Sequence, residues 1–305
     1  MQKTLRAIEF FSGIGAFSQA VKLGQYPIEV VQAFDQSEWA NKTFAHNNGL
    51  TPHATNLDTI KSKAIKEADL WWMSPPCTPY SRRGLRKDLS DPRAASFQHL
   101  LKLMPEHKPQ YILIENVEGF IGSQMEKKLH ETLQALGYKL EKLQLCPSQM
   151  KVPMLRPRLF IVAVLKDVVN LTKAPLEVPV KERSLLNYLS SSSEDFDIMP
   201  AEEVERYTPV LNIVDPREEG ARAICFTSGY YRCRKAAGSL LRTGKDVRYF
   251  QAKEILRLLG FSEDFQIPAE IPANIAYRLV GNSVDTRSIR HLLDCLLTGR
   301  KNTDE

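Results

Sequence analysis

A single cysteine lies in a loop whose backbone is restricted by prolines. Residues 74–81 read Ser-Pro-Pro-Cys-Thr-Pro-Tyr-Ser, with Cys77 between the second and third prolines. Because proline fixes φ and lacks an amide hydrogen, this stretch continues neither a helix nor the interior of a sheet. The apolar run before it, residues 69–73, predicts a buried strand. A lone cysteine is more often a small buried hydrophobe, but a thiol in a rigid loop at a strand end is a candidate nucleophile.

An acid and two arginines follow in places that could join this cysteine in one site. Glu115 ends the apolar stretch 111–114, a predicted strand, and Arg156 and Arg158 precede the predicted strand 159–164. Taken singly, Glu115 would be a salt-bridge partner and the arginines surface charges. In the order cysteine, acid and paired arginines, the four residues resemble the cytosine-5 methyltransferases, and that resemblance makes them a candidate catalytic set.

A glycine turn and an acid indicate a cofactor site. The turn Ser-Gly-Ile-Gly-Ala, residues 12–16, follows a predicted strand over residues 7–11. Glycines between a strand and a helix let the backbone approach a ligand closely. A second predicted strand, 30–34, ends in Asp35, about 20 residues later, where an acid can accept hydrogen bonds from a ribose diol. The pattern fits S-adenosylmethionine as well as NAD, and no second phosphate-binding feature favours NAD.

Composition restricts the class of protein. The chain has 305 residues, enough for one large or two modest domains, and its 43% hydrophobic and 25% charged residues are usual for a soluble globular protein. Apolar runs near 18 residues are absent, which predicts no membrane span, and the first residues show no signal peptide. The five cysteines are widely spaced without a Cys-x-x-Cys pair, which predicts neither a metal site nor disulfides. We therefore expect a reduced, cytoplasmic protein, and nothing in the sequence requires more than a monomer.

Basic residues are concentrated in two segments. Residues 222–248 hold seven basic residues and one acid, with Phe226, Tyr230 and Tyr231 interleaved, and residues 82–93 hold five basic residues against two acids. Either segment alone would be a solvated surface, but two of them beside a chemical site predict a track for a polyanion.

Predicted helices and strands alternate through the first half of the chain. Helices over 94–104 and 124–136 each carry an apolar stripe for core packing. This alternation predicts an α/β fold with a mostly parallel, doubly wound sheet. Ligands of such sheets bind at the carboxyl ends of the strands, where the glycine turn, Asp35, Cys77 and Glu115 are expected.

The chain changes character after residue 166. Prolines and the serine run 190–193 indicate surface loops, followed by a short predicted helix over 201–206 and the basic segment with little periodicity. A helix over 252–259 ends before Gly260, and a final helix over 286–297 has one apolar face for docking on the first domain. We expect a catalytic domain of residues 1–179 plus 275–305 and a smaller domain of residues 180–274.

The order of these motifs resembles the cytosine-5 methyltransferase family over nearly the whole chain. The matching stretches are 11–15, 75–81, 115–117, 156–158, 248–261 and 281–284. The resemblance implies a Rossmann-like S-adenosylmethionine-dependent methyltransferase domain with a smaller target-recognition domain. The cofactor-binding residues it implies are Phe11, Gly13, Ile14, Gly15, Asp35, Asn56, Leu57, Pro76, Asn282 and Ser283.

One branch of that family methylates transfer RNA, and the chain is similar to it. Its members are short and carry a Cys-Phe-Thr tripeptide, present here as residues 225–227, and the Asp35 region with Ala40 and Asn41 is also similar. The implied substrate is tRNA, at cytosine 38 of the anticodon loop of an aspartate-type tRNA, with weak residual DNA binding. The nucleic-acid-binding residues expected are Arg82, Arg83, Arg86, Lys87, Cys225, Phe226, Thr227, Tyr230, Arg232, Arg234 and Lys235.

Two positions depart from the family pattern. Met154 stands where the family usually has glutamine, and Asn56 stands where it has the acid that contacts adenine. Asparagine still donates and accepts hydrogen bonds, so we expect an altered cofactor affinity more than a loss.

The resemblance implies a covalent mechanism for the four candidate residues. Cys77 would add to carbon 6 of cytosine, which breaks the aromaticity of the ring and makes carbon 5 nucleophilic. A protonated Glu115 would hydrogen-bond ring nitrogen 3, Arg158 would hold the carbonyl oxygen, and Arg156 would position the base or a neighbouring phosphate.

Two other functions remain open at this point. A DNA cytosine-5 methyltransferase would have a longer, variable recognition domain without the Cys-Phe-Thr tripeptide. A nucleic-acid binder that kept the fold without catalysis would lack Cys77 or Glu115, and both are present.

Overall fold

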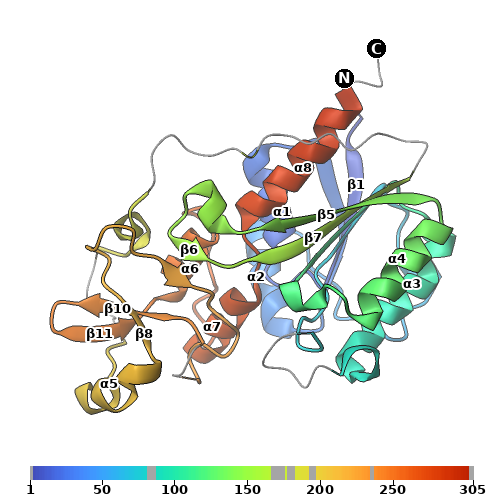
Figure 1. Cartoon of the computed structure of the whole chain (residues 1–305). Helices are drawn as coiled ribbons and strands as arrows, with labels where there is room; N and C mark the ends of the chain where they lie inside the picture. The colour runs from blue at the N-terminus through green and yellow to red at the C-terminus, as the bar shows by residue number, and fades with distance from the viewer. Residues whose placement is uncertain are drawn as a thin grey trace. The chain divides into compact units, whose positions relative to one another are not determined.

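The computed structural model describes residues 3–80, 87–165, 176, 183–191, 197–233 and 237–301 (Figure 1). The chain separates into two compact units. The first unit comprises Met1–Leu145, Pro157–Pro175 and Ile289–Glu305, and the second comprises Cys146–Arg156 and Leu176–Ser288. The expected domain boundaries, 1–179 plus 275–305 and 180–274, stay a prediction.

A six-stranded sheet forms the centre of the first unit. In chain order its strands are β1 (Leu5–Phe10), β2 (Ile28–Phe34), β3 (Leu70–Met73), β4 (Tyr111–Asn116), β5 (Tyr138–Leu145) and β7 (Arg158–Leu165). They are arranged as β2-β1-β3-β4-β7-β5; the first four are parallel, and β7 is antiparallel to both β4 and β5. The predicted α/β fold with a mostly parallel sheet is confirmed. The reversal at β7 and the strand β5 were missed.

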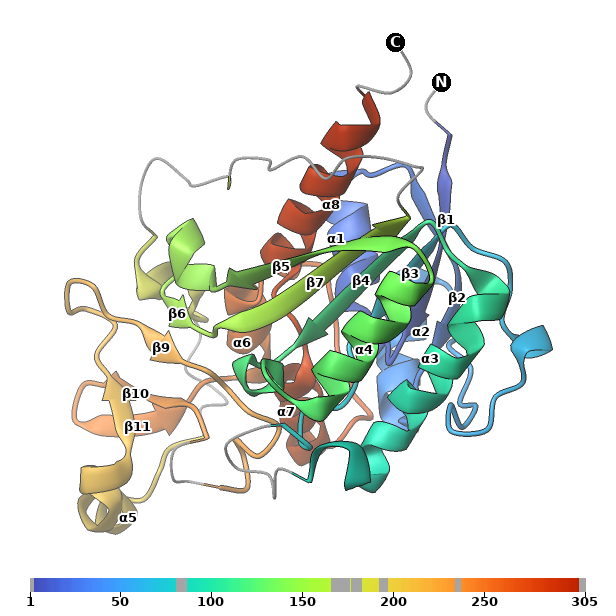
Figure 2. The same cartoon turned by 45° about the vertical axis from the view of Figure 1, so that its right-hand side comes forward.

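Helices cover both faces of this sheet, which explains the apolar composition of its central strands. Figure 2 shows α3 (Ala95–His107) and α4 (Gln124–Ala135) in front of the sheet, with α1 (Ala16–Gly24) and the C-terminal part of α8 (Thr286–Lys301) behind it. On the rear face, Phe17 of α1 stacks on Trp72 of β3 with 5.3 Å between ring centroids. The first unit also contains α2 (Glu38–Asn48).

The predicted apolar stripes pack as expected. In α3 and α4 the stripe residues are buried in one core cluster, apart from Leu136, which follows α4 and packs partly buried against the same cluster. The apolar face predicted for α8 is buried as well, at Ile289, Leu292, Leu293, Leu296 and Leu297. The Tyr26 hydroxyl, in the loop after α1, contacts α8 by donating to the Asp294 carboxylate over 2.6 Å.

The second unit contains shorter elements. Its strands are β6 (Met154–Leu155), β8 (Asn212–Val214), β9 (Ala223–Ile224), β10 (Ser239–Thr243) and β11 (Asp246–Tyr249), and its helices are α5 (Ala201–Tyr207), α6 (Ala252–Leu258) and α7 (Ala273–Asn282). A three-stranded sheet runs β11-β10-β8, and β6 pairs with β9. The predicted short helix and the predicted helix before Gly260 are confirmed as α5 and α6. The strands were missed because two to five residues are too few to show an alternating pattern.

A buried ion pair stabilises this unit. Arg248 Nη2 lies 2.8 Å from Glu254 Oε1, and Nη1 donates to Oε2 over 2.9 Å. The carboxylate also accepts hydrogen bonds from the amides of Ser190 and Gln251. Because both charges have several partners, the cost of burying them is offset by hydrogen bonds.

Seven short 3-10 helices join these elements within the described residues: Ser62–Ala64, Asp88–Ser90, Pro92–Ala94, Glu118–Phe120, Pro147–Met150, Leu185–Tyr188 and Thr208–Val210. None of the helices in the described ranges combines the length and apolar character needed to cross a lipid bilayer.

Candidate active site

The loop after β3 presents Cys77 to solvent on a tethered backbone. Cys77 is exposed, whereas Pro75 is buried. The Ser74 hydroxyl donates to the carbonyl oxygen of Phe11 over 3.0 Å, and the amide of Tyr80 donates to the carbonyl oxygen of Cys77 over 3.0 Å. The loop is therefore attached to the β1 end on one side and closed into a turn on the other.

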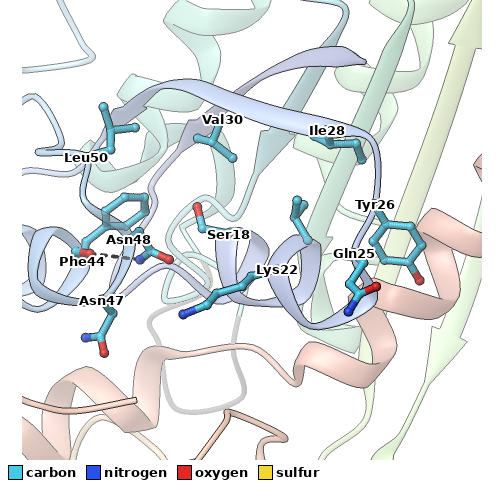
Figure 3. Close-up of a pocket in the computed structure, with 11 residues that line it drawn as sticks. Ser18, Lys22, Gln25, Tyr26, Ile28, Val30, Phe44, Asn47, Asn48 and Leu50 are labelled. Carbon is cyan, nitrogen blue, oxygen red and sulfur yellow. Dashed lines mark hydrogen bonds between the residues drawn. The ribbon is translucent and has the colours of Figure 1, made fainter. Parts of the chain in front are cut away.

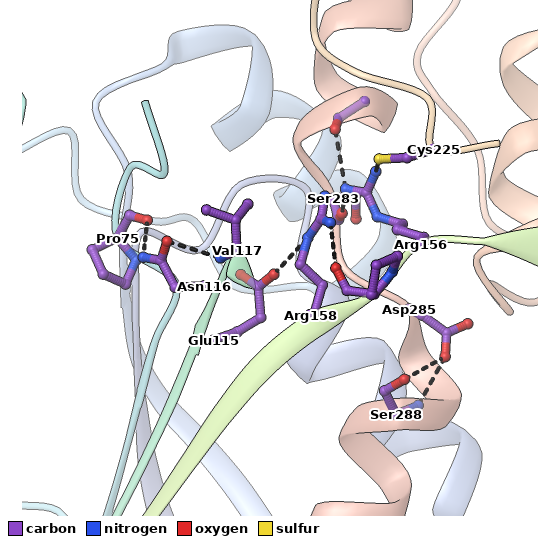
Figure 4. Close-up of polar contacts among 12 residues, drawn as sticks. Pro75, Glu115, Asn116, Val117, Arg156, Arg158, Cys225, Ser283, Asp285 and Ser288 are labelled. Atoms are coloured by element: carbon purple, nitrogen blue, oxygen red, sulfur yellow. Dashed lines mark hydrogen bonds and ion pairs between the residues drawn. The ribbon is translucent and has the colours of Figure 1, made fainter. Parts of the chain in front are cut away.

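The neighbouring strand attaches the same loop from its other side. In the parallel pair β3 and β4, Met73 lies opposite Ile114, which brings Ser74 and Pro75 level with Glu115 and Asn116. The Asn116 side chain donates to the carbonyl oxygen of Pro75 over 3.3 Å (Figure 4). The predicted acid and the cysteine loop thus share one edge of the sheet.

Glu115 faces Arg158 at this edge. Arg158 Nε lies 3.1 Å from Glu115 Oε1, and the two side chains are only 15% and 10% exposed (Figure 4). The antiparallel β7 produces this contact, because its first residue, Arg158, meets the carboxyl end of β4. The guanidinium also donates to the Pro157 carbonyl over 2.8 Å. A fixed carboxyl and a fixed guanidinium can recognise the polar edge of a flat heterocycle.

Arg156 lies in the second unit and binds backbone carbonyls. It is 3% exposed. Its Nη1 donates to the Phe226 carbonyl over 2.7 Å and to Cys225 Sγ over 3.0 Å, and its Nη2 donates to the carbonyls of Ser283, over 2.6 Å, and Gly281, over 3.1 Å. Three of the predicted motifs are joined by this one side chain. These hydrogen bonds favour a role in holding the backbone, and the predicted contact with the base or a neighbouring phosphate stays a prediction.

Gly281 allows the two backbone segments that Arg156 joins to lie close together. A Cβ built on Gly281 would lie 2.4 Å from the backbone of Thr227. A side chain at this position would therefore separate the two segments that Arg156 joins.

The glycine turn has the conformation expected for close approach to a ligand. Gly13 has φ of 52° and Gly15 has φ of 90°, and a Cβ on Gly15 would lie 2.7 Å from the Asn48 side chain. Phe11 also has a positive φ, 55°. The turn therefore depends on glycine for conformation at both positions and for space at Gly15.

Asp35 holds this turn in place. Its Oδ2 accepts from the amide of Gly13 and its Oδ1 from the amide of Ser37, each over 2.8 Å. Burial raises the pKa of the Asp35 carboxyl, and these two amides oppose that shift. Each carboxylate oxygen keeps a second lone pair, so the expected bond to a ribose diol remains open.

The surroundings of the turn fit an adenosine-type cofactor. Within the described residues, the buried Ser12 hydroxyl has no hydrogen-bond partner, and no atom lies within 4 Å of a Cβ built on Gly13. Leu57 is buried, and Asn56 Oδ1 accepts from the Gln36 side chain and the Asp58 amide. Of the remaining predicted cofactor residues, Phe11, Ile14 and Pro76 lie in the first unit, and Asn282 and Ser283 lie in the second.

Met154, the departure from the family pattern, is a core residue. It is fully buried in β6, opposite Ala223 of β9. Its role here is packing in the second unit.

The predicted nucleic-acid residues divide into three groups. Arg82, Arg83, Arg86, Arg234 and Lys235 lie outside the described residues. Lys87 and Arg232 are exposed and Thr227 is half-buried, while Cys225 accepts a hydrogen bond from Arg156.

Phe226 and Tyr230 form the third group, and for them the prediction needs correction. They are 1% and 2% exposed, and their rings pack edge to face at 5.0 Å. The Tyr230 hydroxyl donates to the Ser239 carbonyl and accepts from the Phe250 amide. Their rings are covered by protein, so they cannot stack on bases.

One cation near the cysteine was missed as a site residue. Arg93 forms a two-pronged pair with the buried Asp91, at 2.8 Å for Nε to Oδ1 and 2.7 Å for Nη2 to Oδ2. This pairing lowers the pKa of Asp91 to about 2. Asp91 likewise raises the pKa of Arg93, and the negative charge of Cys77 adds to that rise. The charge of Arg93 would therefore favour a thiolate at Cys77, and the paired Asp91 carboxylate opposes that effect.

A separate hollow lies in the first unit (Figure 3). Its volume is about 530 Å³. Its lining comes from α1, β2, α2 and the loops that follow α1 and α2, and it includes Ser18, Lys22, Tyr26 and Phe44. None of the predicted site residues is in its lining among the described residues.

Comparisons with known proteins agree on the family. Residues 5–297 match the sequence profile of the C-5 cytosine-specific DNA methylase family. The tRNA (cytosine(38)-C(5))-methyltransferase of Schizosaccharomyces pombe is 32% identical over 97% of this chain and 97% of its own length, and that of Rattus norvegicus is 31% identical over 96% and 99%. Among solved structures, a methyltransferase of Entamoeba histolytica is 29% identical with a TM-score of 0.87, covering 97% of this chain and 99% of that chain.

Proposed function

The chain belongs to the C-5 cytosine-specific DNA methylase family, and on that basis we propose that it methylates carbon 5 of a cytosine in tRNA. Relatives that it matches over nearly their full length are tRNA (cytosine(38)-C(5))-methyltransferases. Position 38 of the anticodon loop is therefore the proposed target, and S-adenosylmethionine the proposed methyl donor.

The observation that carries the proposal is the grouping of reactive side chains at one sheet edge. Cys77 lies on a loop tied to β4 through Asn116, and Glu115 of β4 is paired with Arg158 of β7. An exposed thiol beside a carboxyl and a guanidinium provides a nucleophile and two groups for the polar edge of a base. Arg93 adds positive charge near the thiol.

The proposed reaction begins with covalent addition. The Cys77 thiolate forms a bond to carbon 6 of the cytosine. Glu115, protonated when the base is bound, donates a hydrogen bond to ring nitrogen 3, and Arg158 binds the carbonyl oxygen. S-adenosylmethionine, when bound, supplies an electrophilic methyl group on its sulfonium. Carbon 5 takes the methyl group, whose bond to the sulfonium sulfur breaks and leaves a neutral thioether. A base then takes the proton from carbon 5, and the electron pair of that carbon–hydrogen bond expels the Cys77 sulfur from carbon 6 as a thiolate.

The first unit offers residues to hold the cofactor. We propose that the glycine turn borders its amino-acid end, that Asp35 accepts from the ribose diol, and that Leu57 and Asn56 border the adenine. The open space at Gly13 and the unpartnered Ser12 hydroxyl among the described residues support this assignment.

An unpaired loop is a favourable substrate for this chemistry. A target base must leave its stack before a side chain can reach carbon 6. That costs less in an anticodon loop than in a duplex. The exposed Arg232 of the second unit is a candidate contact for the RNA phosphates.

Methyl transfer from labelled S-adenosylmethionine to bulk tRNA and to duplex DNA, measured in parallel, tests the proposal. We expect label in tRNA, loss of label in Cys77→Ala, and no loss in Cys233→Ala, because Cys233 is exposed like Cys77 but belongs to the second unit. If only the DNA is labelled, the substrate is DNA and not tRNA. Full methylation by Cys77→Ala would exclude the covalent mechanism. The monomeric state, the cytoplasmic location and weak DNA binding stay predictions.

A further inference from the structure

An aromatic cluster in the second unit has one exposed member. Tyr231 is 36% exposed, whereas Tyr230, Tyr249 and Tyr277 are at most 8% exposed. The Tyr231 ring lies parallel to the Tyr277 ring, with centroids 5.0 Å apart and an angle of 8° between the planes. Tyr249 contacts Tyr231 in a tilted arrangement at 6.0 Å. Tyr231 is therefore the outermost layer of a stack whose inner layer is buried.

The backbone around this ring is held by a tight turn. The amide of Tyr230 donates to the Thr227 carbonyl over 3.0 Å, and the amides of Arg232 and Cys233 both donate to the Gly229 carbonyl, over 3.0 Å and 2.7 Å. The backbone that carries the Tyr231 ring is therefore held by its own hydrogen bonds.

An acidic side chain lies near the hydroxyl end of the ring. The charge of Asp197 raises the pKa of the Tyr231 phenol, and a hydrogen bond between the two side chains adds to this effect. Because the ring is already ordered, a ligand that stacks on it orders few additional groups, and little conformational entropy is lost on binding.

Charge restricts what such a ligand can be. The next residue, Arg232, is exposed and positive, while Asp197 places a negative charge at the hydroxyl end of the ring. A flat ligand with an attached anion would therefore stack on the ring with its anion toward Arg232. An unpaired nucleotide has this shape and charge, because every base has a π-face and every linkage a phosphate.

A single exposed aromatic residue is ordinary on protein surfaces. What distinguishes Tyr231 is its parallel packing on the buried Tyr277 and the exposed cation next to it, Arg232. We propose that Tyr231, backed by Tyr277, is a platform on which an unpaired nucleotide of the RNA substrate stacks. This inference rests on the proposed function and names a binding residue that the predicted nucleic-acid set did not include.

The experiment uses an anticodon stem–loop RNA that carries 2-aminopurine at one loop position at a time. Stacking on a tyrosine quenches 2-aminopurine fluorescence, so binding and stacking are read together. We expect one loop position to be quenched by the wild-type protein and by Tyr231→Phe and Tyr231→Trp, which keep an aromatic face. Tyr231→Ala and Tyr231→Leu should lose the quenching and bind the RNA roughly 5- to 100-fold more weakly.

Kinetics and controls separate stacking from general damage. Tyr231→Leu still covers Tyr277 with apolar atoms, so it stands in if Tyr231→Ala does not fold. We expect both variants to raise KM for the RNA with little change in kcat and no change in the dissociation constant for S-adenosylmethionine. Tyr207→Ala is the matched control, because Tyr207 is a half-buried tyrosine of the same unit outside the stack.

The outcomes distinguish the two proposals. If Tyr231→Leu binds the RNA, quenches the fluorescence and methylates as the wild-type protein does, the platform proposal fails and the proposed function stands. If the wild-type protein binds the stem–loop with Tyr231-dependent quenching but does not methylate it, the proposed function fails and the platform stands. If the wild-type protein neither binds nor methylates RNA, both fail.

Discussion

The Ser74 hydroxyl donates a hydrogen bond to the carbonyl oxygen of Phe11 over 3.0 Å, joining the cysteine loop to the start of the glycine turn 63 residues earlier. Phe11 has φ of 55°, a conformation that residues other than glycine adopt at an energetic cost. The hydrogen bond thus helps to hold a strained residue. The proposed nucleophile and the proposed cofactor site are mechanically connected through it.

Ser74→Ala should weaken both cofactor binding and methyl transfer. Loss of one hydrogen bond costs about 1 kcal/mol, so we expect the dissociation constant for S-adenosylmethionine to rise about 3- to 10-fold and kcat to fall. Calorimetric titration of the cofactor and single-turnover methylation measure the two effects. Thr132→Ala is the control, since it removes a hydroxyl-to-carbonyl hydrogen bond of 2.8 Å on α4, away from the turn. Equal changes in both variants would show that Ser74 acts through overall stability alone.

Glu115→Gln should remove catalysis while leaving cofactor binding intact. Glutamine keeps the shape of the side chain but cannot serve as an acid, and it leaves Arg158 without the charge that lies 3.1 Å away. Losses of about 100- to 10,000-fold are typical when an acid–base group is removed. Single-turnover methyl transfer and a cofactor titration provide the two measurements. A variant with near wild-type turnover would show that the reaction does not need an acidic proton from Glu115, because the glutamine amide can still donate a hydrogen bond to the base.

Arg93→Gln should make the Cys77 thiol less reactive. The thiolate is the reactive form, and a nearby cation favours it. We expect the rate of Cys77 alkylation by iodoacetamide at pH 7.5 to fall about 2- to 5-fold, measured by mass spectrometry of the modified peptide. Cys233, alkylated in the same sample, is the internal control because it is exposed in the second unit. Parallel slowing at both cysteines, or none at Cys77, would contradict the proposed electrostatic effect.

Glu9 should make the stability of the fold depend on pH. Burial raises the pKa of this carboxyl to about 8, against an ordinary value of 4.5, while the Ser18 hydroxyl donates to it over 2.6 Å. The folded protein therefore binds more protons than the unfolded chain between these values. The contribution of Glu9 to the free energy of unfolding is fully present below pH 4.5. It decreases as the pH rises toward 8, by at most about 1.4 kcal/mol per pH unit.

Glu9→Gln should flatten that dependence. Glutamine stays neutral and still accepts from Ser18, so urea unfolding at several pH values between 5 and 8 should show a smaller slope than in the wild type. Asp35, whose pKa burial also raises, contributes in the same direction and remains in both proteins. Identical slopes in the two proteins would mean that Glu9 does not titrate in this range.

The sequence by itself determined the order of the motifs and most of the first unit. The apolar runs, the helical stripes and the glycine turn are local patterns, and each predicts its structure from the period of its own residues. The alternation of strands and helices predicted that Asp35, Cys77 and Glu115 lie at the carboxyl ends of the strands. The strand β5, the reversal at β7 and the short strands of the second unit could not be predicted, because pairing partners are not visible in one segment.

Contacts between distant residues were decided by the tertiary structure. The sequence suggests that Arg156 positions the target base or a neighbouring phosphate, but its guanidinium donates to groups 69 to 127 residues further along the chain. Tyr230 and Tyr231 are adjacent and identical in kind, yet one is 2% and the other 36% exposed. Which of them could meet a nucleotide depends on Ser239, Phe250 and Tyr277 packing around them. Burial is a property of the assembled core, and no local pattern in the basic segment records it.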